Sequence, residues 1–235
     1  MMKKFLFTAC TIMMSATFAF SQDEIPEVEF NYYLVRSGME DSLLIGESYS
    51  GDAPATIKFH MSPKHTAGYD AVYKWEFRKD DESADPFITR YDTLTTYTFI
   101  ESGTFIIKGL CYLNNDDEPD FSSTFSVSIP TSILDFPNAF SPNNDNINDY
   151  YNAKKGAKSL IEFHAYIFNR WGQKLYEWTD PYTQSKGWDG KYNGKDVAQG
   201  VYFLYCEAKG ADGRIYTFRQ DVNLLRNYTE GGIIE

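Results

Sequence analysis

Residues 160–168 read Leu-Ile-Glu-Phe-His-Ala-Tyr-Ile-Phe, and this stretch decides the fold class. The odd-numbered positions from Ile161 to Ile167 are apolar, and they alternate with Glu162, His164 and Tyr166. A period of two residues is typical of a β-strand that buries one face. We therefore predict a strand over residues 160–168, with the odd-numbered side chains in a core.

Further strand and turn signals follow this stretch. Residues 169–172, Asn-Arg-Trp-Gly, predict a turn in which Gly172 is free to take a positive φ, and a second strand follows around residues 175–178. Residues 200–206 are apolar on both faces, which predicts a central strand. Turn signals at residues 187–190, 193–194 and 212–213 and a last strand within 215–226 complete the pattern of a small all-β sandwich.

Residues 141–149, Ser-Pro-Asn-Asn-Asp-Asn-Ile-Asn-Asp, are almost all turn formers and predict an ordered turn cluster. Calcium could use the side-chain oxygens of Asn143, Asp145, Asn148 and Asp149, because it takes six to eight oxygen ligands. Only two of these residues are carboxylates, and the Asp-x-Asp-x-Asp-Gly spacing is missing. A solvated turn is therefore favoured over a metal site, and we predict no metal.

Residues 22–130 predict a second sandwich, with strands at 56–61, 71–78, 94–99, 103–112 and 122–129. Tyr73, Trp75 and Phe77 lie on one face of their strand, where Trp75 fits the central tryptophan of an immunoglobulin-like core. Residues 51–54, 75–77 and 97–105 resemble a PKD-type repeat, although Arg-Lys-Asp-Asp-Glu at 78–82 replaces the usual Gly-Asp-Gly. Residues 130–132 are a short hinge rather than a free linker.

The first 21 residues predict a secretory signal peptide. Two lysines precede an apolar run from Phe5 to Met14, which is too short to span a bilayer, and small residues follow at Ala19 and Ser21. Cleavage after Ser21 would make Gln22 the first residue. Lipidation at Cys10 is disfavoured, because cleavage there would divide the apolar run.

Charge and cysteine positions exclude several kinds of partner and crosslink. Loss of Lys3 and Lys4 with the signal peptide reduces 22 basic residues to 20, against 33 acidic ones, which gives a formal net charge of −13. Such an acidic chain predicts no nucleic-acid partner and no attraction to anionic lipid. Cys111 and Cys206 each lie in an apolar strand, so buried unpaired thiols are favoured over a disulfide between them.

The same C-terminal residues carry a family resemblance. Phe140 to Asp149, Phe168 to Gly172, Trp188 to Gly190, Gly200 to Phe203 and Leu224 to Arg226 occur in an order that resembles the gliding-motility-associated C-terminal domain. This is the type B sorting domain of type IX secretion cargo, and the resemblance covers residues 136–226. Asn146 stands where the family usually has Gly, Gln220 and Asp221 replace a common Gly, and residues 227–235 extend past the usual end.

The resemblance implies a sorting signal rather than a catalytic activity. It implies export by the type IX secretion machinery and retention at the outer cell surface through a PorP/SprF-like outer-membrane β-barrel protein, without a membrane span of the chain's own. The residues that it implies in sorting or partner binding are Asn169, Arg170, Trp171, Gly172, Trp188, Asp189, Gly190, Gly200, Tyr202, Leu225 and Arg226. Arg170 is the best candidate for an exposed recognition residue, and a salt bridge to a neighbouring acid is the alternative.

No catalytic constellation is apparent in the sequence. His60, His65 and His164 have no metal-ligand spacing, and Gly-x-Ser-x-Gly, Walker and Cys-x-x-Cys motifs are absent. We predict a non-enzymatic, secreted protein without a cofactor, made of two immunoglobulin-like β-sandwich domains in tandem after a signal peptide. It would act as an adaptor or component of the secretion or gliding machinery. The alternative is a surface adhesin or glycan-binding module, for which Tyr32, Tyr33, Tyr69 and Tyr73 could supply stacking faces.

Overall fold

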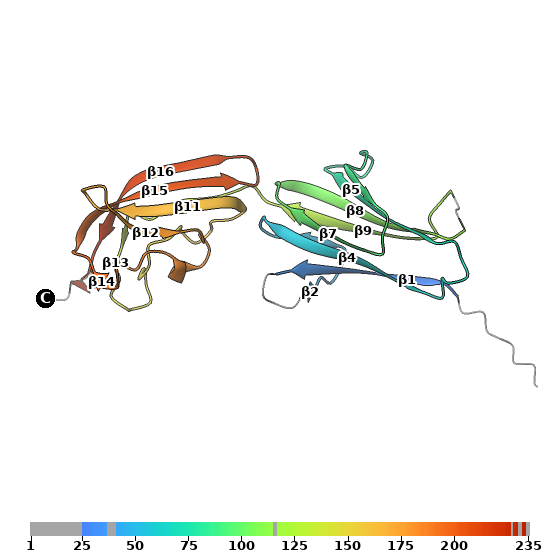
Figure 1. Cartoon of the computed structure of the whole chain (residues 1–235), viewed down its shortest axis with the longest axis horizontal. Coiled ribbons are helices and arrows are strands. Elements are labelled where there is room, and N and C mark those ends of the chain that lie inside the picture. Colours follow the sequence, from blue (N-terminus) through green and yellow to red (C-terminus); the bar gives the residue numbers. More distant parts are fainter. Residues whose placement is uncertain (1–24, 37–40, 115–116, 227, 230–231, 234–235) are drawn as a thin grey trace, which may run out of the picture.

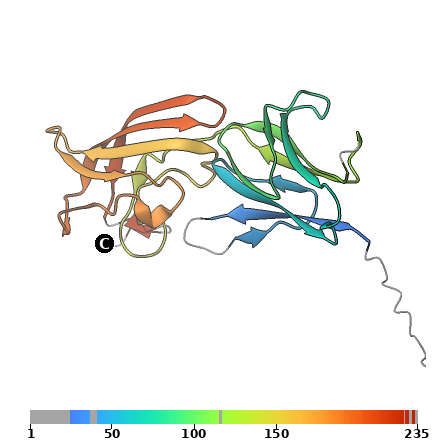
Figure 2. The ribbon, with the colours of Figure 1, turned by 45° about the vertical axis from the view of Figure 1, so that its right-hand side comes forward.

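The computed structural model describes residues 25–36, 41–114, 117–226, 228–229 and 232–233. These residues are all β-strand, turn and loop, apart from one 3₁₀ turn, η1 (Gln184–Lys186). The strands form two groups that follow each other end to end along the long axis of the molecule (Figures 1 and 2). Residues 1–24 lie outside the described part, and with them the predicted signal peptide and Cys10. Of the predicted extension, residues 227–235, the structure describes the short pair β17 (Tyr228–Thr229) and β18 (Gly232–Ile233).

The N-terminal group contains two sheets. One has the order β2-β1-β4-β7 and the other has the order β3-β9-β8-β5-β6. Most neighbours pair antiparallel, while β3 pairs parallel with β9. The strands of the first sheet are β1 (Glu27–Val35), β2 (Ser42–Leu43), β4 (Ala55–Lys64) and β7 (Leu94–Phe99). Those of the second are β3 (Ser48–Ser50), β5 (Val72–Lys79), β6 (Ile88–Arg90), β8 (Gly103–Tyr112) and β9 (Phe121–Ile129).

Aromatic side chains fill the space between these two sheets. Trp75 on β5 is 0% exposed, as predicted, and its ring packs against Phe59 at 5.6 Å and Phe30 at 6.1 Å between centroids. Tyr32 on β1 lies in the same core, stacked on Phe125. The expectation that Tyr32 offers a stacking face to a glycan is therefore wrong, because the alternation along β1 turns this ring inward.

The C-terminal group has a five-stranded sheet of order β10-β16-β15-β11-β12 and a small hairpin, β13-β14. The β11 strand covers Leu160–Phe168, as predicted, and pairs antiparallel with both neighbours. The other strands are β10 (Ala139–Phe140), β12 (Lys174–Trp178), β13 (Lys191–Tyr192), β14 (Lys195–Asp196), β15 (Gly200–Gly210) and β16 (Ile215–Leu224).

Within the described part of the chain, one face of this sheet is covered and the other is open. The segments 134–158 and 179–199, which consist mostly of loop, bring Phe136, Tyr151 and Trp188 against the inner face, where they form a second hydrophobic cluster. The β15 strand is central, as predicted. Val201 is 49% exposed and Phe203 is 40% exposed, which shows that the outer side chains of β15 are not covered. Apolar residues on both faces of β15 therefore do not mean that both faces are buried.

The two groups of strands meet along the turn between β15 and β16. Ala211 in this turn is buried in the N-terminal cluster, and Ile161 packs against that cluster from β11. The amide of Ser102 donates to the carbonyl of Ala211 at 2.9 Å, and the amide of Ala53 donates to Ser159 Oγ at 3.4 Å. The junction is thus formed by apolar packing together with hydrogen bonds.

The predicted hinge at residues 130–132 is part of this junction. Ser132 is buried, and its hydroxyl donates to Asp212 Oδ1 at 2.6 Å. The hydroxyl of Tyr216 lies 2.9 Å from Ser132 Oγ and donates to the Ser132 carbonyl at 3.0 Å. Leu134, two residues before the predicted start of the second unit, is already buried in the C-terminal cluster. The segment therefore connects the two groups as a fixed element.

Cys111 and Cys206 are buried free thiols, so the predicted unpaired state is confirmed. Burial raises the pKa of the Cys206 thiol to about 12, which leaves this thiol protonated and unreactive at neutral pH. Within the described residues, no helix has the length and apolar character required to cross a membrane.

Candidate functional site

The turn between β11 and β12, residues 169–172, is the most exposed part of the predicted site, and we call it the Trp171 turn. The side chain of Asn169 organises it. Asn169 Oδ1 accepts hydrogen bonds from the amides of Trp171 and Gln173, both at 3.0 Å. Gly172 has φ +77°, in the left-handed region that the sequence predicted for it. An Asx-type turn of this kind follows from an Asn at the first position and a Gly at the last.

Arg170 and Trp171 project from this turn. Trp171 is 75% exposed, and the guanidinium carbon of Arg170 lies 4.3 Å from the centroid of its ring. This is cation–π geometry, in which each side chain limits the freedom of the other. No ion pair of Arg170 is found within the described residues, so the alternative of a salt bridge to a neighbouring acid is not realised there.

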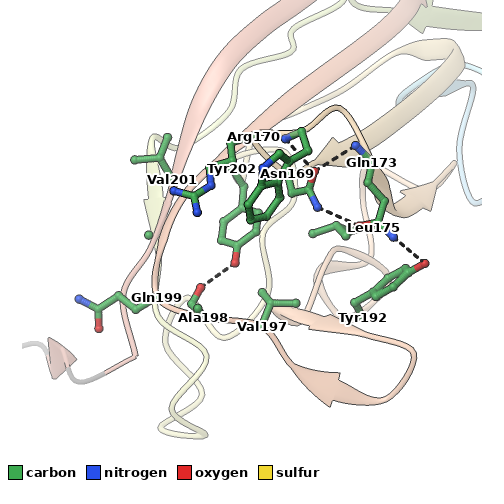
Figure 3. Close-up of a pocket in the computed structure, with 12 residues that line it drawn as sticks. Asn169, Arg170, Gln173, Leu175, Tyr192, Val197, Ala198, Gln199, Val201 and Tyr202 are labelled. Atoms are coloured by element: carbon green, nitrogen blue, oxygen red, sulfur yellow. Dashed lines mark hydrogen bonds between the residues drawn. The ribbon is translucent and has the colours of Figure 1, made fainter.

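A hollow of about 500 Å³ lies beside the turn (Figure 3). Leu175, Val197 and Val201 supply apolar parts of its lining, and Gln173 and Tyr192 supply polar ones. Gln173 Nε2 donates to the hydroxyl of Tyr192 at 3.2 Å, which ties the turn to the β13-β14 hairpin. The site therefore combines an exposed Arg–Trp pair with an open, partly apolar depression, which suits recognition of a protein side chain better than catalysis.

A second part of the predicted set lies inside the fold. Trp188 is fully buried, and its indole nitrogen donates to the carbonyl of Lys191 at 2.9 Å. Gly190 has φ +75°, and an added Cβ would lie 2.9 Å from Leu224 Cδ1, so this position accepts only glycine without strain. Asp189 caps the same turn, because its Oδ1 accepts from the amide of Lys191 at 3.0 Å.

Arg226 fixes this turn from the end of β16. Its Nη2 donates to the carbonyl of Gly190 at 2.7 Å, and its Nε donates to the carbonyl of Val197 at 2.9 Å. A weaker contact of 3.5 Å joins Nη1 to Asp196. The guanidinium is thus used within the molecule, and it holds the loop that forms one wall of the hollow.

The remaining predicted residues lie on β15 and directly after β16. Gly200 and Tyr202 line the hollow directly. Tyr202 is buried, packs on Trp188 at 4.9 Å and donates its hydroxyl to the carbonyl of Ala198 at 2.7 Å (Figure 3). Leu225 is half-buried, and its amide donates to the carbonyl of Phe140 at 3.0 Å. The predicted set therefore comprises an exposed turn and an internal frame that supports it.

Residues 134–218 match the family model described as the CHU_C type IX secretion signal domain. The chain carries a type IX secretion signal domain. The matched region contains the Trp171 turn, the hollow and the buried Trp188. The match supports type IX secretion of this chain, and a signal of this family implies export and attachment at the cell surface.

The solved structures that match this chain resemble it only weakly. A mixed-linkage glucan utilisation protein of Bacteroides ovatus, SGBP-B, solved with a heptasaccharide, matches at 13% identity and a TM-score of 0.23, over 76% of this chain and 42% of its own. Dimeric latent PorU of Porphyromonas gingivalis matches at 14% identity and a TM-score of 0.24, over 87% of this chain and 20% of its own. The chain thus spans less than half the length of either structure. No curated protein sequence matches it.

The turn cluster of the signal domain at residues 141–149 is held by its own side chains. Asp149 accepts hydrogen bonds from the amides of Asn143, Asn144 and Asn146 at 2.7–2.9 Å, so both of its oxygens are engaged. Asn146 has φ +67°, which explains why it can replace the usual glycine. No cluster of three or more His, Cys, Asp or Glu suited to a metal ion occurs in the described ranges.

The sequence did not point to the lining residues Tyr192, Val197 and Val201. Tyr192 lies in a short hairpin without clear periodicity and Val197 directly follows it, while Val201 belongs to a strand that is predicted only to be central. Only the fold brings them to the Trp171 turn. A weak signal was available in the Asn193-Gly194 dipeptide, which predicts a two-residue hairpin and therefore an approach of Tyr192 to Lys195.

Proposed function

We propose that this type IX cargo is retained at the outer cell surface by protein contact through its Trp171 turn, docked on a PorP/SprF-like outer-membrane β-barrel protein. In this role it serves as a non-enzymatic adaptor or component of the secretion or gliding machinery. The observation that carries the proposal is the Arg170–Trp171 pair, because an exposed tryptophan stacked by an arginine is the chemistry enriched at protein-binding hot spots.

The surroundings of the pair support this role. Trp171 is 75% exposed at the tip of a hairpin, where a partner can reach it, and the Asx turn beneath it limits the conformational entropy that binding would cost. The hollow beside it offers a place for a partner's side chain. Trp188, Gly190, Tyr202 and Arg226 would act indirectly, by holding the loop that forms the wall of the hollow.

We further propose two units, an immunoglobulin-like or PKD-like unit at residues 22–130 and the sorting unit at 136–226. Ser132 to Asp135 are best assigned to the sorting unit, because Leu134 is buried in its core and Ile133 exchanges backbone hydrogen bonds with Lys158 at 3.0 and 3.1 Å.

Charge reversal at the turn tests the docking proposal. In a cell with type IX secretion, Arg170→Glu should move the protein from the cell surface to the medium and reduce its crosslinking to a membrane protein. The thermal midpoint of the purified variant should stay unchanged, since Arg170 is exposed. Lys155→Glu is the matched control, because it places the same charge change on an exposed residue of the same unit. Surface retention and crosslinking of Arg170→Glu at the level of the control would refute the proposal.

A further inference from the structure

A row of aromatic rings covers the outer face of the C-terminal sheet, on the side away from the buried cluster. We call it the aromatic face, and it consists of His164, Tyr166 and Phe168 on β11 and Phe203 and Tyr205 on β15. These are the outward positions of the two strands, and all five side chains are exposed or partly exposed.

Three of the rings of this face are roughly parallel to one another. Tyr166 and Tyr205 stand directly opposite each other across β11 and β15, with centroids 6.3 Å apart and planes 27° apart. His164 stacks beside Tyr166 at 5.6 Å and 14°, and Phe168 continues the row at 6.3 Å. Alternate residues of a strand are spaced in this way, so the sheet itself sets the interval between rings.

Shallow depressions extend the face at both ends of the tyrosine pair. Phe168, Phe203, Tyr205 and Arg219 line one of about 640 Å³ next to the Trp171 turn, and His164, Glu207 and Lys209 line another of about 270 Å³ toward the junction. The arrangement is therefore a long, open track rather than a closed pocket. An open track accommodates a chain that continues past both ends.

Charges along the track are balanced. Four basic side chains border it, namely Arg170, Lys174, Lys209 and Arg219. Four acidic side chains lie among them, namely Glu162, Glu177, Glu207 and Asp221. On a chain of net charge −11 this is a locally neutral surface. It offers no net attraction to a polyanion or a polycation, and it complements an uncharged ligand that is rich in hydrogen-bonding groups.

We infer that the aromatic face is a binding track for a neutral polysaccharide. The faces of sugar rings present C–H groups with partial positive charge, and the negative π-faces of the partly exposed Tyr166 and Tyr205 would attract such groups. Arg219 and Lys174 now lie 5.4 and 5.6 Å from the centroids of Tyr205 and Tyr166. Their long side chains can move aside and donate to sugar hydroxyls. This activity is separate from docking through the Trp171 turn, and it places glycan binding on the sorting unit rather than on the N-terminal sandwich.

Affinity electrophoresis of the purified mature chain tests the inference. Hydroxyethyl cellulose, xylan and starch are the neutral probes, and alginate is the carboxylated one. We expect at least one neutral polymer to retard the protein, with little sensitivity to salt. The double variant Tyr166→Ala/Tyr205→Ala should bind about tenfold more weakly, because two stacked rings are lost. Tyr91→Ala, which removes an exposed ring of the N-terminal group, should bind like the wild type.

Three outcomes would overturn the inference. Retardation by none of the neutral polymers is the first, and retardation by alginate alone, abolished by salt, is the second. The third concerns a second copy of the chain. If sedimentation shows a dimer that the double variant converts to monomer at unchanged thermal midpoint, the face is a self-association surface. The double variant keeps the Trp171 turn, so it should still be retained at the cell surface even where it no longer binds the polymer. Failure of glycan binding can therefore be told apart from failure of docking.

Discussion

At the scale of single residues, Trp75 is the largest fully buried side chain of the N-terminal core. Trp75→Ala should lower the free energy of unfolding by about 3–5 kcal/mol, which is a large part of a typical domain stability of about 5–15 kcal/mol. Chemical denaturation followed by circular dichroism measures this loss. The exposed Tyr91→Ala is the control, with an expected change within about 0.5 kcal/mol.

The indole nitrogen of Trp75 has no hydrogen-bond partner within the described structure, which makes a second substitution informative. Trp75→Phe removes this buried polar atom together with part of the ring, so it should be much less destabilising than the alanine variant. Equal losses for the two variants would mean that a phenyl ring recovers none of the packing that the indole provides.

At the scale of elements, Arg226 joins the end of β16 to the loop before β15. Arg226→Ala leaves the carbonyls of Gly190 and Val197 without their donor, so we expect a loss of about 1–3 kcal/mol in the free energy of unfolding. Arg170→Ala, at the other predicted arginine, should leave stability unchanged, since this side chain stacks only on an exposed ring. Thermal denaturation of both variants provides the comparison. Equal stability of the two would contradict a framing role for Arg226.

The same elements show what can be predicted from the sequence. The bounds of β11 were predictable because its alternation is complete, and the turn at residues 169–172 was predictable because Asn and Gly have fixed conformational preferences. The β1 strand was missed, although Val28, Phe30, Tyr32 and Leu34 carry the same alternating signal. The open outer face of β15 was not predictable, since what covers a strand depends on distant segments.

The candidate site likewise has features that local sequence predicts and features that depend on distant segments. Local signals identified the Trp171 turn and the glycine at position 190, because each depends on backbone conformation. These local signals did not predict which side chains are exposed. Trp171 and Trp188 lie in similar turn motifs, yet the fold buries one and exposes the other. The internal use of Arg226 depends on carbonyl groups of residues 190 and 197, which no periodicity connects to it.

At the scale of the whole molecule, the junction contains a carboxylate whose charge supports the fold. The hydrogen bond from Ser132 holds the pKa of Asp212 below its ordinary value of 3.8, and amide hydrogen bonds add to this effect. The folded chain therefore binds the proton less readily than the unfolded chain does. The resulting stability is present at neutral pH and is lost as the pH falls through and below about 3.8.

Asp212→Asn should remove this part of the pH dependence. We expect the variant to melt below the wild type at neutral pH and to approach it at a pH below 3.8, as measured by thermal denaturation across that range. A constant difference between the two proteins at every pH would show that the charge of Asp212 does not contribute. Asp221→Asn, on the exposed outer face, is the control for loss of one negative charge.

The position of the junction at one end of the long strands also determines how the molecule would carry a pulling force. Leu160 and Gly210 lie beside the N-terminal group, whereas Phe168 and Phe203 lie at the opposite end with the Trp171 turn. Tension between a held turn and the N-terminal group would therefore run along β11 and β15. Antiparallel hydrogen bonds are perpendicular to their strands, so they would resist such tension together in shear instead of opening one after another. The signal domain would thus serve as a stiff tether between the cell surface and whatever the rest of the chain holds.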